Sequence, residues 1–68
     1  MKKYRIIVTR HLNGKTTVLE NVEIESDKSV SEILCNDALW LCKKHSIDNT
    51  KAKLYELENG LEFWRGTI

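Results

Sequence analysis

The stretch SVSEILCNDALWLCKKH, residues 29–45, lies between two Asn-Gly pairs and carries apolar residues at helical spacing. Ser29 followed three residues later by Glu32 forms a capping box, which marks the start of a helix. The basic residues at the far end of the stretch suit the negative end of a helix dipole. We therefore expect one helix, which ends at about Lys44 or His45.

The Asn-Gly pairs, residues 13–14 and 59–60, each stand between stretches rich in apolar residues. Both residue types tolerate positive φ, so this pair is the strongest short-range signal for a β-hairpin. The sequence thus predicts an α+β fold of ββαββ order, with two hairpins in a four-stranded, mainly antiparallel sheet and the helix on one face. The 68 residues suit a single domain over residues 1–68.

The first hairpin contains a conflict of register. Its strands carry two alternating apolar sets: Tyr4, Ile6 and Val8, then Val18, Val22 and Ile24. A two-residue turn would put these sets on opposite faces, because side-chain direction along a strand has a period of two. One extra residue restores a common face. We predict either a three-residue turn with a left-handed Gly14, or a bulge near Glu20 and Asn21.

The second hairpin has a simple register, in which a two-residue turn sets Tyr55 opposite Trp64 and Glu56 opposite Phe63. Its apolar residues then divide between two faces: Ala52, Leu54, Leu61 and Phe63 on one, and Tyr55, Leu57, Trp64 and Ile68 on the other. A single helix can cover only one of these faces. We expect the first face to join the core and the second to show an aromatic pair to solvent or to a partner.

The helix has more apolar surface than one sheet covers, because its apolar arc on a helical wheel exceeds roughly 200°. The wheel gives it a centre and two flanks: Val30, Leu34, Ala38 and Leu41 at the centre, Cys42, Cys35 and Leu39 on one flank, and Ile33 and Trp40 on the other. Asp37 and Lys44 separate Trp40 from the centre. We expect Trp40, with Ile33 beside it, to stay exposed and to contact another molecule.

The two cysteines suit a core helix better than a reactive site. Cys35 and Cys42 are about 10.5 Å apart along a straight helix, beyond the roughly 7 Å that a disulfide spans between Cα atoms. Cys42 and His45 could share a metal ion, but no Cys-x-x-Cys pair completes a tetrahedral site. Cys42 also lies at the negative end of the helix, where a thiol is not activated. We expect both to be reduced, buried and free of metal.

The other titratable residues indicate no catalytic site. We expect His45 to interact with carbonyl groups at the helix end, and His11 to be solvated beside the first turn. Glu56, Glu58 and Glu62 are expected to form a solvated acidic tip. No phosphate-binding glycine loop and no Ser-His-Asp arrangement occurs. The sequence predicts no catalytic residue, no metal and no cofactor.

Net charge and hydropathy limit the class of partner and the cellular location that we expect. Eleven basic and ten acidic residues give a net charge of +1, which argues against a nonspecific nucleic-acid binder. The apolar run after MKKYR is only IIV, too short for a signal-peptide core or a membrane span. We expect a cytoplasmic protein that does not enter a membrane, or one in a host cytoplasm if it is viral.

These features favour a small protein-binding module, an adaptor or inhibitor that acts by contact without catalysis. Its partner would be another protein or a second copy in a homodimer, because aromatic residues dominate interfaces and an open sheet has two edges. By analogy, such chains suit the inhibitors made by phages and mobile elements. The predicted partner-binding residues are Ile33, Asp37, Trp40, Lys44, Tyr55 and Trp64. We expect Trp40→Ala to weaken binding by about 2 kcal/mol.

The alternative is a small nucleic-acid-binding module. Tyr55 and Trp64 on an open sheet face could stack unpaired bases. Lys53 shares that face, and further basic residues lie on strand one: Lys2, Lys3, Arg5 and Arg10. Glu62 on the same face and the near-neutral net charge count against this alternative.

Overall fold

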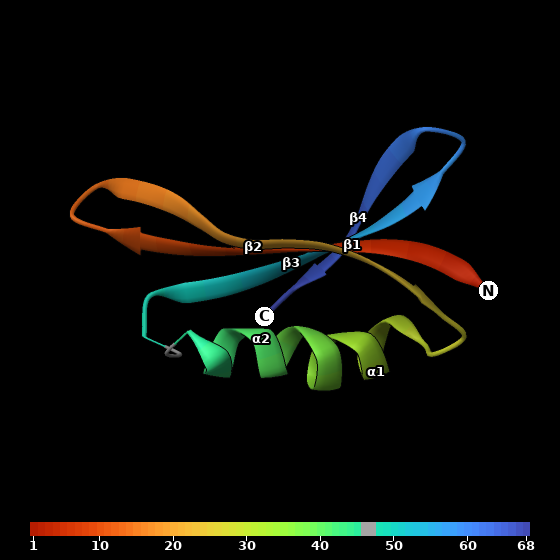
Figure 1. The fold of residues 1–68 in the computed structure, drawn as a ribbon, viewed down its shortest axis with the longest axis horizontal. Coiled ribbons are helices and arrows are strands. Elements are labelled where there is room, and N and C mark those ends of the chain that lie inside the picture. Colours follow the sequence, from red (N-terminus) through yellow and green to blue (C-terminus); the bar gives the residue numbers. More distant parts are fainter. Residues whose placement is uncertain (46–47) are drawn as a thin grey trace.

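Four antiparallel strands form one sheet, and a single helical segment lies across one face of it (Figure 1). The computed structural model describes residues 1–45 and 48–68. The strands are β1 (Lys2–Leu12), β2 (Lys15–Ser26), β3 (Thr50–Glu58) and β4 (Leu61–Thr67). Their order across the sheet is β2-β1-β3-β4, so β2 and β4 are the edges. The predicted α+β fold of ββαββ order is confirmed.

Both Asn-Gly pairs form two-residue turns. The φ angles are 52° at Asn13 and 76° at Gly14, and 52° at Asn59 and 79° at Gly60. Positive φ at both central residues is the turn geometry whose twist matches that of the flanking strands. The two predicted hairpins are therefore confirmed.

The register conflict in the first hairpin is resolved by a bulge, and the three-residue turn was the wrong alternative. Val8 pairs with Glu20 but Thr9 pairs with Val18, which leaves Leu19 as the extra residue of β2. The predicted bulge is thus displaced by about one residue. It brings Val22 onto the helix side of the sheet beside the β1 core residues and turns Val18 to the other, open face, where it is exposed.

The second hairpin has the predicted pairing near its turn. Tyr55 lies opposite Trp64, and Glu56 lies opposite Phe63. A second bulge, which the sequence did not predict, follows at Arg65, because Leu54 pairs with Gly66. The extra residue turns its side chain to the helix side, where Arg65 Nε donates to Glu56 Oε1 at 3.1 Å.

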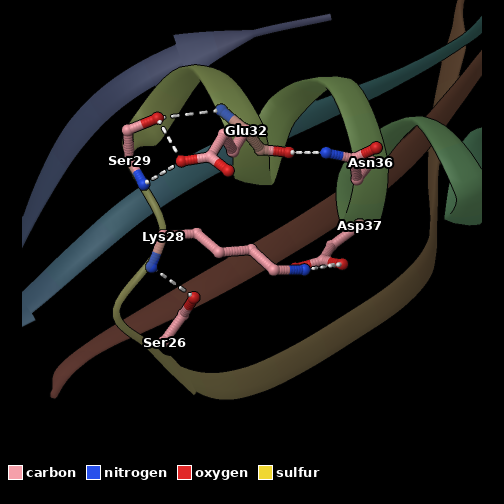
Figure 2. Close-up of polar contacts among 6 residues, drawn as sticks. All are labelled: Ser26, Lys28, Ser29, Glu32, Asn36 and Asp37. Atoms are coloured by element: carbon pink, nitrogen blue, oxygen red, sulfur yellow. Dashed lines mark hydrogen bonds and ion pairs between the residues drawn. The ribbon is translucent and has the colours of Figure 1, made fainter.

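The helix begins at the predicted capping box (Figure 2). The Ser29 hydroxyl accepts from the Glu32 backbone N–H at 3.2 Å, and the Glu32 carboxylate accepts from the Ser29 backbone N–H at 3.2 Å. The helical segment comprises α1 (Val30–Ile33), η1 (Leu34–Ala38) and α2 (Leu39–Lys44). Its end at Lys44 agrees with the prediction.

The segment η1 is a π-helical turn, which the sequence analysis did not predict. A π turn holds one residue more than an α turn, so it displaces the residues after it by about 100° on the helical wheel. The Asn36 side chain donates to the Glu32 carbonyl at 2.8 Å (Figure 2). In an α-helix that carbonyl accepts the backbone N–H of residue 36. Three consecutive residues, Cys35, Asn36 and Asp37, are weak helix formers. This run was the feature of the sequence that could have indicated an irregular turn.

The π turn changes which helix residues face the sheet. Ile33 and Ala38, five residues apart, are both fully buried, and Cys42 is 1% exposed. The expectation that Ile33 is exposed beside Trp40 was therefore wrong. Cys35, expected in the core, is turned out to solvent. The buried core comprises Tyr4, Ile6, Val8, Ile33, Ala38, Leu41, Cys42, Ala52 and Leu54.

The helix covers only part of its side of the sheet. It meets β4 at Gly66, where a Cβ would lie 2.6 Å from Leu34 Cδ1. Beyond that contact, the β3–β4 hairpin twists away from the helix (Figure 1). Leu61 and Phe63 were predicted to join the core face, but they are 59% and 40% exposed because the helix does not reach them.

The stretch SIDNTK, residues 46–51, was expected to form the loop after the helix, but Thr50 and Lys51 belong to β3. Residues 46 and 47 lie outside the described residues. Asn49 has a φ of 59°, and β3 begins at Thr50. Within the described part of the chain, no helix has the length and apolar character needed to cross a membrane.

Candidate partner-binding surfaces

The structure separates the residues that were predicted to bind a partner. They occupy three places: Asp37, Trp40 and Lys44 on the outside of the helix, Tyr55 and Trp64 on the open face of the sheet, and Ile33 in the core. The helix side and the open face are opposite sides of the sheet, because residues of alternating parity point to opposite faces. Two surfaces therefore remain as candidates, and Ile33 belongs to neither.

Trp40 is 63% exposed, which confirms the predicted exposure. The Lys44 ammonium lies 5.9 Å from the centroid of its ring and 3.2 Å from Glu20 Oε1. Asp37 is paired with Lys28 at 3.7 Å (Figure 2). Lys44 and Asp37 thus already have partners within the chain, and the apolar area of the indole is not covered.

His45 does not use its side chain as predicted. Its Nε2 lies 2.7 Å from Glu20 Oε1, so the expected interaction with helix carbonyl groups was wrong. The Arg10 guanidinium instead donates to the His45 carbonyl, one of the groups that a helix end leaves without a partner. Hydrogen bonds from His45 and then Lys44 hold the pKa of Glu20 below its usual value of 4.5. These contacts fasten the end of the helix to β1 through Arg10 and to β2 through Glu20.

The cysteines differ from each other. Both are free thiols, but Cys35 is exposed and Cys42 is buried. Burial raises the pKa of the Cys42 thiol, so it stays protonated and unreactive at neutral pH. In the described residues, no three His, Cys, Asp or Glu side chains gather closely enough to hold a metal ion.

The three glutamates predicted to form a solvated acidic tip have different surroundings. Glu56 is only 8% exposed and contacts Arg65 at 3.1 Å and Lys2 at 3.9 Å. Glu62 lies 2.6 Å from Arg5. Glu58 and Glu62 are both exposed, although Glu62 is ion-paired, so the predicted solvated tip was wrong only for Glu56.

The open face carries the predicted aromatic pair. Trp64 is 60% exposed and stands opposite the half-buried Tyr55. Its indole Nε1 donates to Thr67 Oγ1 at 3.0 Å, which restrains the ring. Arg5 lies beside Tyr55 on the same face and is paired with Glu23 and with Glu62.

One surface was missed by the sequence analysis. It is the turn-proximal part of the edge strand β4, residues Leu61, Glu62, Phe63 and Trp64, here called the β4 tip. Its apolar side chains are exposed on both faces of the sheet. The sequence of β3 did indicate this exposed surface, because its core-side positions change from the apolar Ala52 and Leu54 to the acidic Glu56 and Glu58. That change marks where the helix stops covering the sheet.

No protein-family model, curated protein or solved structure matches the chain. The protein therefore has three candidate binding surfaces: the outer side of the helix, the open face and the β4 tip.

Proposed function

We propose that the protein is a small protein-binding module, an adaptor or inhibitor without catalysis, and that its partner adds a strand along the β4 tip. The observation that carries this proposal is an edge strand whose exposed side chains include Leu61, Phe63 and Trp64. On its outer side, β4 has no strand neighbour among the described residues. Backbone groups of such an edge can pair with a strand of another chain.

The exposed side chains suit this mode of binding. Leu61 and Phe63 point to the helix side, and Trp64 points to the open face. A strand added beside them would bury apolar area on both of its own faces. Clustered aromatic residues of this kind supply most of the binding energy in many interfaces.

The length of the added strand is limited by the bulge at Arg65. Beyond it, Ile68 forms backbone hydrogen bonds with Ala52 at 2.9 and 3.3 Å. Bulges interrupt regular pairing at a sheet edge and oppose indefinite association. The opposite edge, β2, has its own bulge at Leu19. These features favour one short, specific contact at the β4 tip.

A second copy of the chain is an alternative partner. Two β4 tips can pair antiparallel about a two-fold axis, so that the same residues lie on both sides of the interface. We place the action of the protein in the cytoplasm, because the exposed free thiol of Cys35 suits a reducing compartment.

The proposal is tested with tagged wild-type, Phe63→Ser and Trp40→Ala proteins incubated in lysate of the native host cell. Phe63→Ser should weaken capture of the partner about 30-fold, which corresponds to about 2 kcal/mol. Trp40→Ala is the control, because it removes an even more exposed aromatic side chain from the outer side of the helix. If Trp40→Ala failed to capture the partner and Phe63→Ser still captured it, the contact would lie on the helix and not at the β4 tip.

Analytical ultracentrifugation of the same three proteins identifies a second copy as the partner. A wild-type dimer that dissociates in Phe63→Ser would assign the β4 tip to self-association. A monomer at all concentrations, together with a captured protein, would assign it to a different chain.

A further inference from the structure

A hollow of about 470 Å³ lies where the β1–β2 hairpin meets the start of β3. Its lining residues all carry side chains that can donate a hydrogen bond, and they include Thr9, His11, Thr16, Thr50, Lys51 and Lys53. No carboxylate lines it, whereas each of four other surface hollows among the described residues includes at least one. Cationic and hydroxyl groups without a nearby carboxylate favour an anionic ligand, and phosphate is the commonest biological one with this preference.

The two lysines of this hollow are available to a ligand. Among the described residues, no carboxylate lies within 4.0 Å of the ammonium group of Lys51 or Lys53, whereas Lys28 and Lys44 are both ion-paired. Both Lys51 and Lys53 are exposed. Their charge is therefore not used within the fold.

Aromatic side chains continue the same face. Lys51, Lys53 and Tyr55 follow one another on the open face of β3, with about 6.6 Å between successive members. Trp64 stands opposite Tyr55 on β4 and is 60% exposed. A phosphate held by the lysines would thus have an aromatic surface beside it, at a distance suited to the base of the same or the next nucleotide.

The far end of the open face limits how far such a ligand extends. There, Arg5 is paired with both Glu23 and Glu62, so its charge is more than balanced by the two carboxylates. Glu25, opposite Lys3, adds a further carboxylate at that end. A polyanionic backbone that continued past Trp64 would meet this acidic region and be repelled.

We propose that the open face binds a short single-stranded nucleic-acid segment of one or two nucleotides, with phosphate at Lys51 and Lys53 and a base stacked on Trp64. Stacking on an exposed aromatic side chain next to basic groups is how many proteins hold unpaired strands. This site shares Trp64 with the β4 tip, but its two lysines lie on β3, outside the tip, and the helix-side residues Leu61 and Phe63 take no part in it.

The test uses Trp40→Phe protein, in which Trp64 is the sole tryptophan and reports stacking by fluorescence quenching. A tetrathymidylate single strand at low salt should quench it. Replacing both Lys51 and Lys53 by Ala should weaken binding about tenfold or more. The matched control replaces Lys28 and Lys43 by Ala, which removes the same charge on the helix side of the sheet and should change affinity less than about twofold. Neutralising two phosphates of a single strand predicts a slope of about −1.4 for log K against log salt.

Several outcomes would overturn this proposal: no quenching at low salt, an equal loss in both lysine pairs, or affinity independent of salt. Equal affinity for thymidine monophosphate and tetrathymidylate would reject the strand and assign the site to a free nucleotide. Unchanged thermal midpoints of the lysine variants establish that they are folded. Phe63→Ser should leave quenching unchanged. A failure of the nucleic-acid proposal can therefore be told apart from a failure of the proposed protein contact.

Discussion

Two groups of apolar side chains on the helix side of the sheet have opposite surroundings. Ile6, Val8 and Leu54 are fully buried beneath the helix, whereas Leu61 and Phe63, which point to the same side, are 59% and 40% exposed. Their residue types and the side of the sheet that they face do not distinguish them, although the first three lie on central strands and the other two on an edge strand. The difference arises because the helix meets β4 at Gly66 and extends no further over the hairpin.

This comparison separates what stabilises the fold from what is left for binding. The covered part of the sheet, together with Ile33 and Cys42 of the helix, supplies the buried apolar area that stabilises the domain. The β4 tip and the outer side of the helix contribute less buried area. Variants in the covered part should therefore lower stability, and variants outside it should alter binding or reactivity instead.

The two cysteines should show the largest difference between covered and uncovered positions. Cys35 is exposed, whereas Cys42 is buried and its pKa is raised by burial. A maleimide or disulfide reagent should therefore modify Cys35 promptly. Cys42 should react slower by a factor on the order of 1,000, because its modification requires the core to open. Mass spectrometry of the native protein checks this, and two equally fast thiols would contradict the buried position of Cys42.

Ile33→Ala should cost about 2–5 kcal/mol of stability, the usual cost of truncating a buried aliphatic side chain to alanine. Ile33 is fully buried against the covered part of the sheet, although the helical wheel placed it at an exposed edge. Urea unfolding followed by circular dichroism measures the loss. A cost below about 0.5 kcal/mol is typical of a surface position and would restore the helical-wheel placement.

The fold was predictable because its signals are local. The turns at residues 13–14 and 59–60 depend on backbone conformations that Asn and Gly adopt readily. The start of the helix depends on Ser29 and Glu32, three residues apart. The need for an extra residue in the first hairpin followed from parity alone, but parity did not decide between a three-residue turn and a bulge.

The candidate sites were less predictable because they depend on where the helix ends in space. The π turn displaced the helical wheel, which moved Ile33 inward and Cys35 outward. Phe63 is exposed because the helix does not extend over it. Trp40 was placed correctly because the displacement carries it further from the core. Neither the π turn nor the reach of a helix follows from alternation or periodicity within one segment.

Ser29→Ala should cost about 1 kcal/mol, the usual loss when an N-cap acceptor is removed. The Ser29 hydroxyl accepts from the Glu32 backbone N–H, and the helix that it starts covers the core. The loss should appear as a shift of the denaturation midpoint with an unchanged slope. Ser29→Asp is the matched control, because aspartate also caps helices and should retain most of the stability.

Glu20→Gln should have a smaller effect that depends on pH. His45 and Lys44 hold the pKa of Glu20 below 4.5 in the folded state. A depressed carboxyl pKa contributes stability that is present above the unfolded pKa and is lost as pH falls through the folded pKa. Wild type should therefore exceed Glu20→Gln at about pH 6, and the two should converge as the pH falls below 4.5. A constant difference in urea midpoint across this range would mean that the ionised carboxylate does not contribute.

Trp40→Ala should have the smallest effect on folding, within about 0.5 kcal/mol, which is typical of a surface substitution. Trp40 is as exposed as Trp64, but it projects from the outer side of the helix and not from a strand. Its nearest charged group, Lys44, is already paired with Glu20 and loses only a weak contact with the ring. Thermal and urea unfolding of the variant measure the change. A loss of about 3 kcal/mol or more, as for a core tryptophan, would show that Trp40 is part of the core. In that case, residues outside the covered part of the sheet would also stabilise the fold.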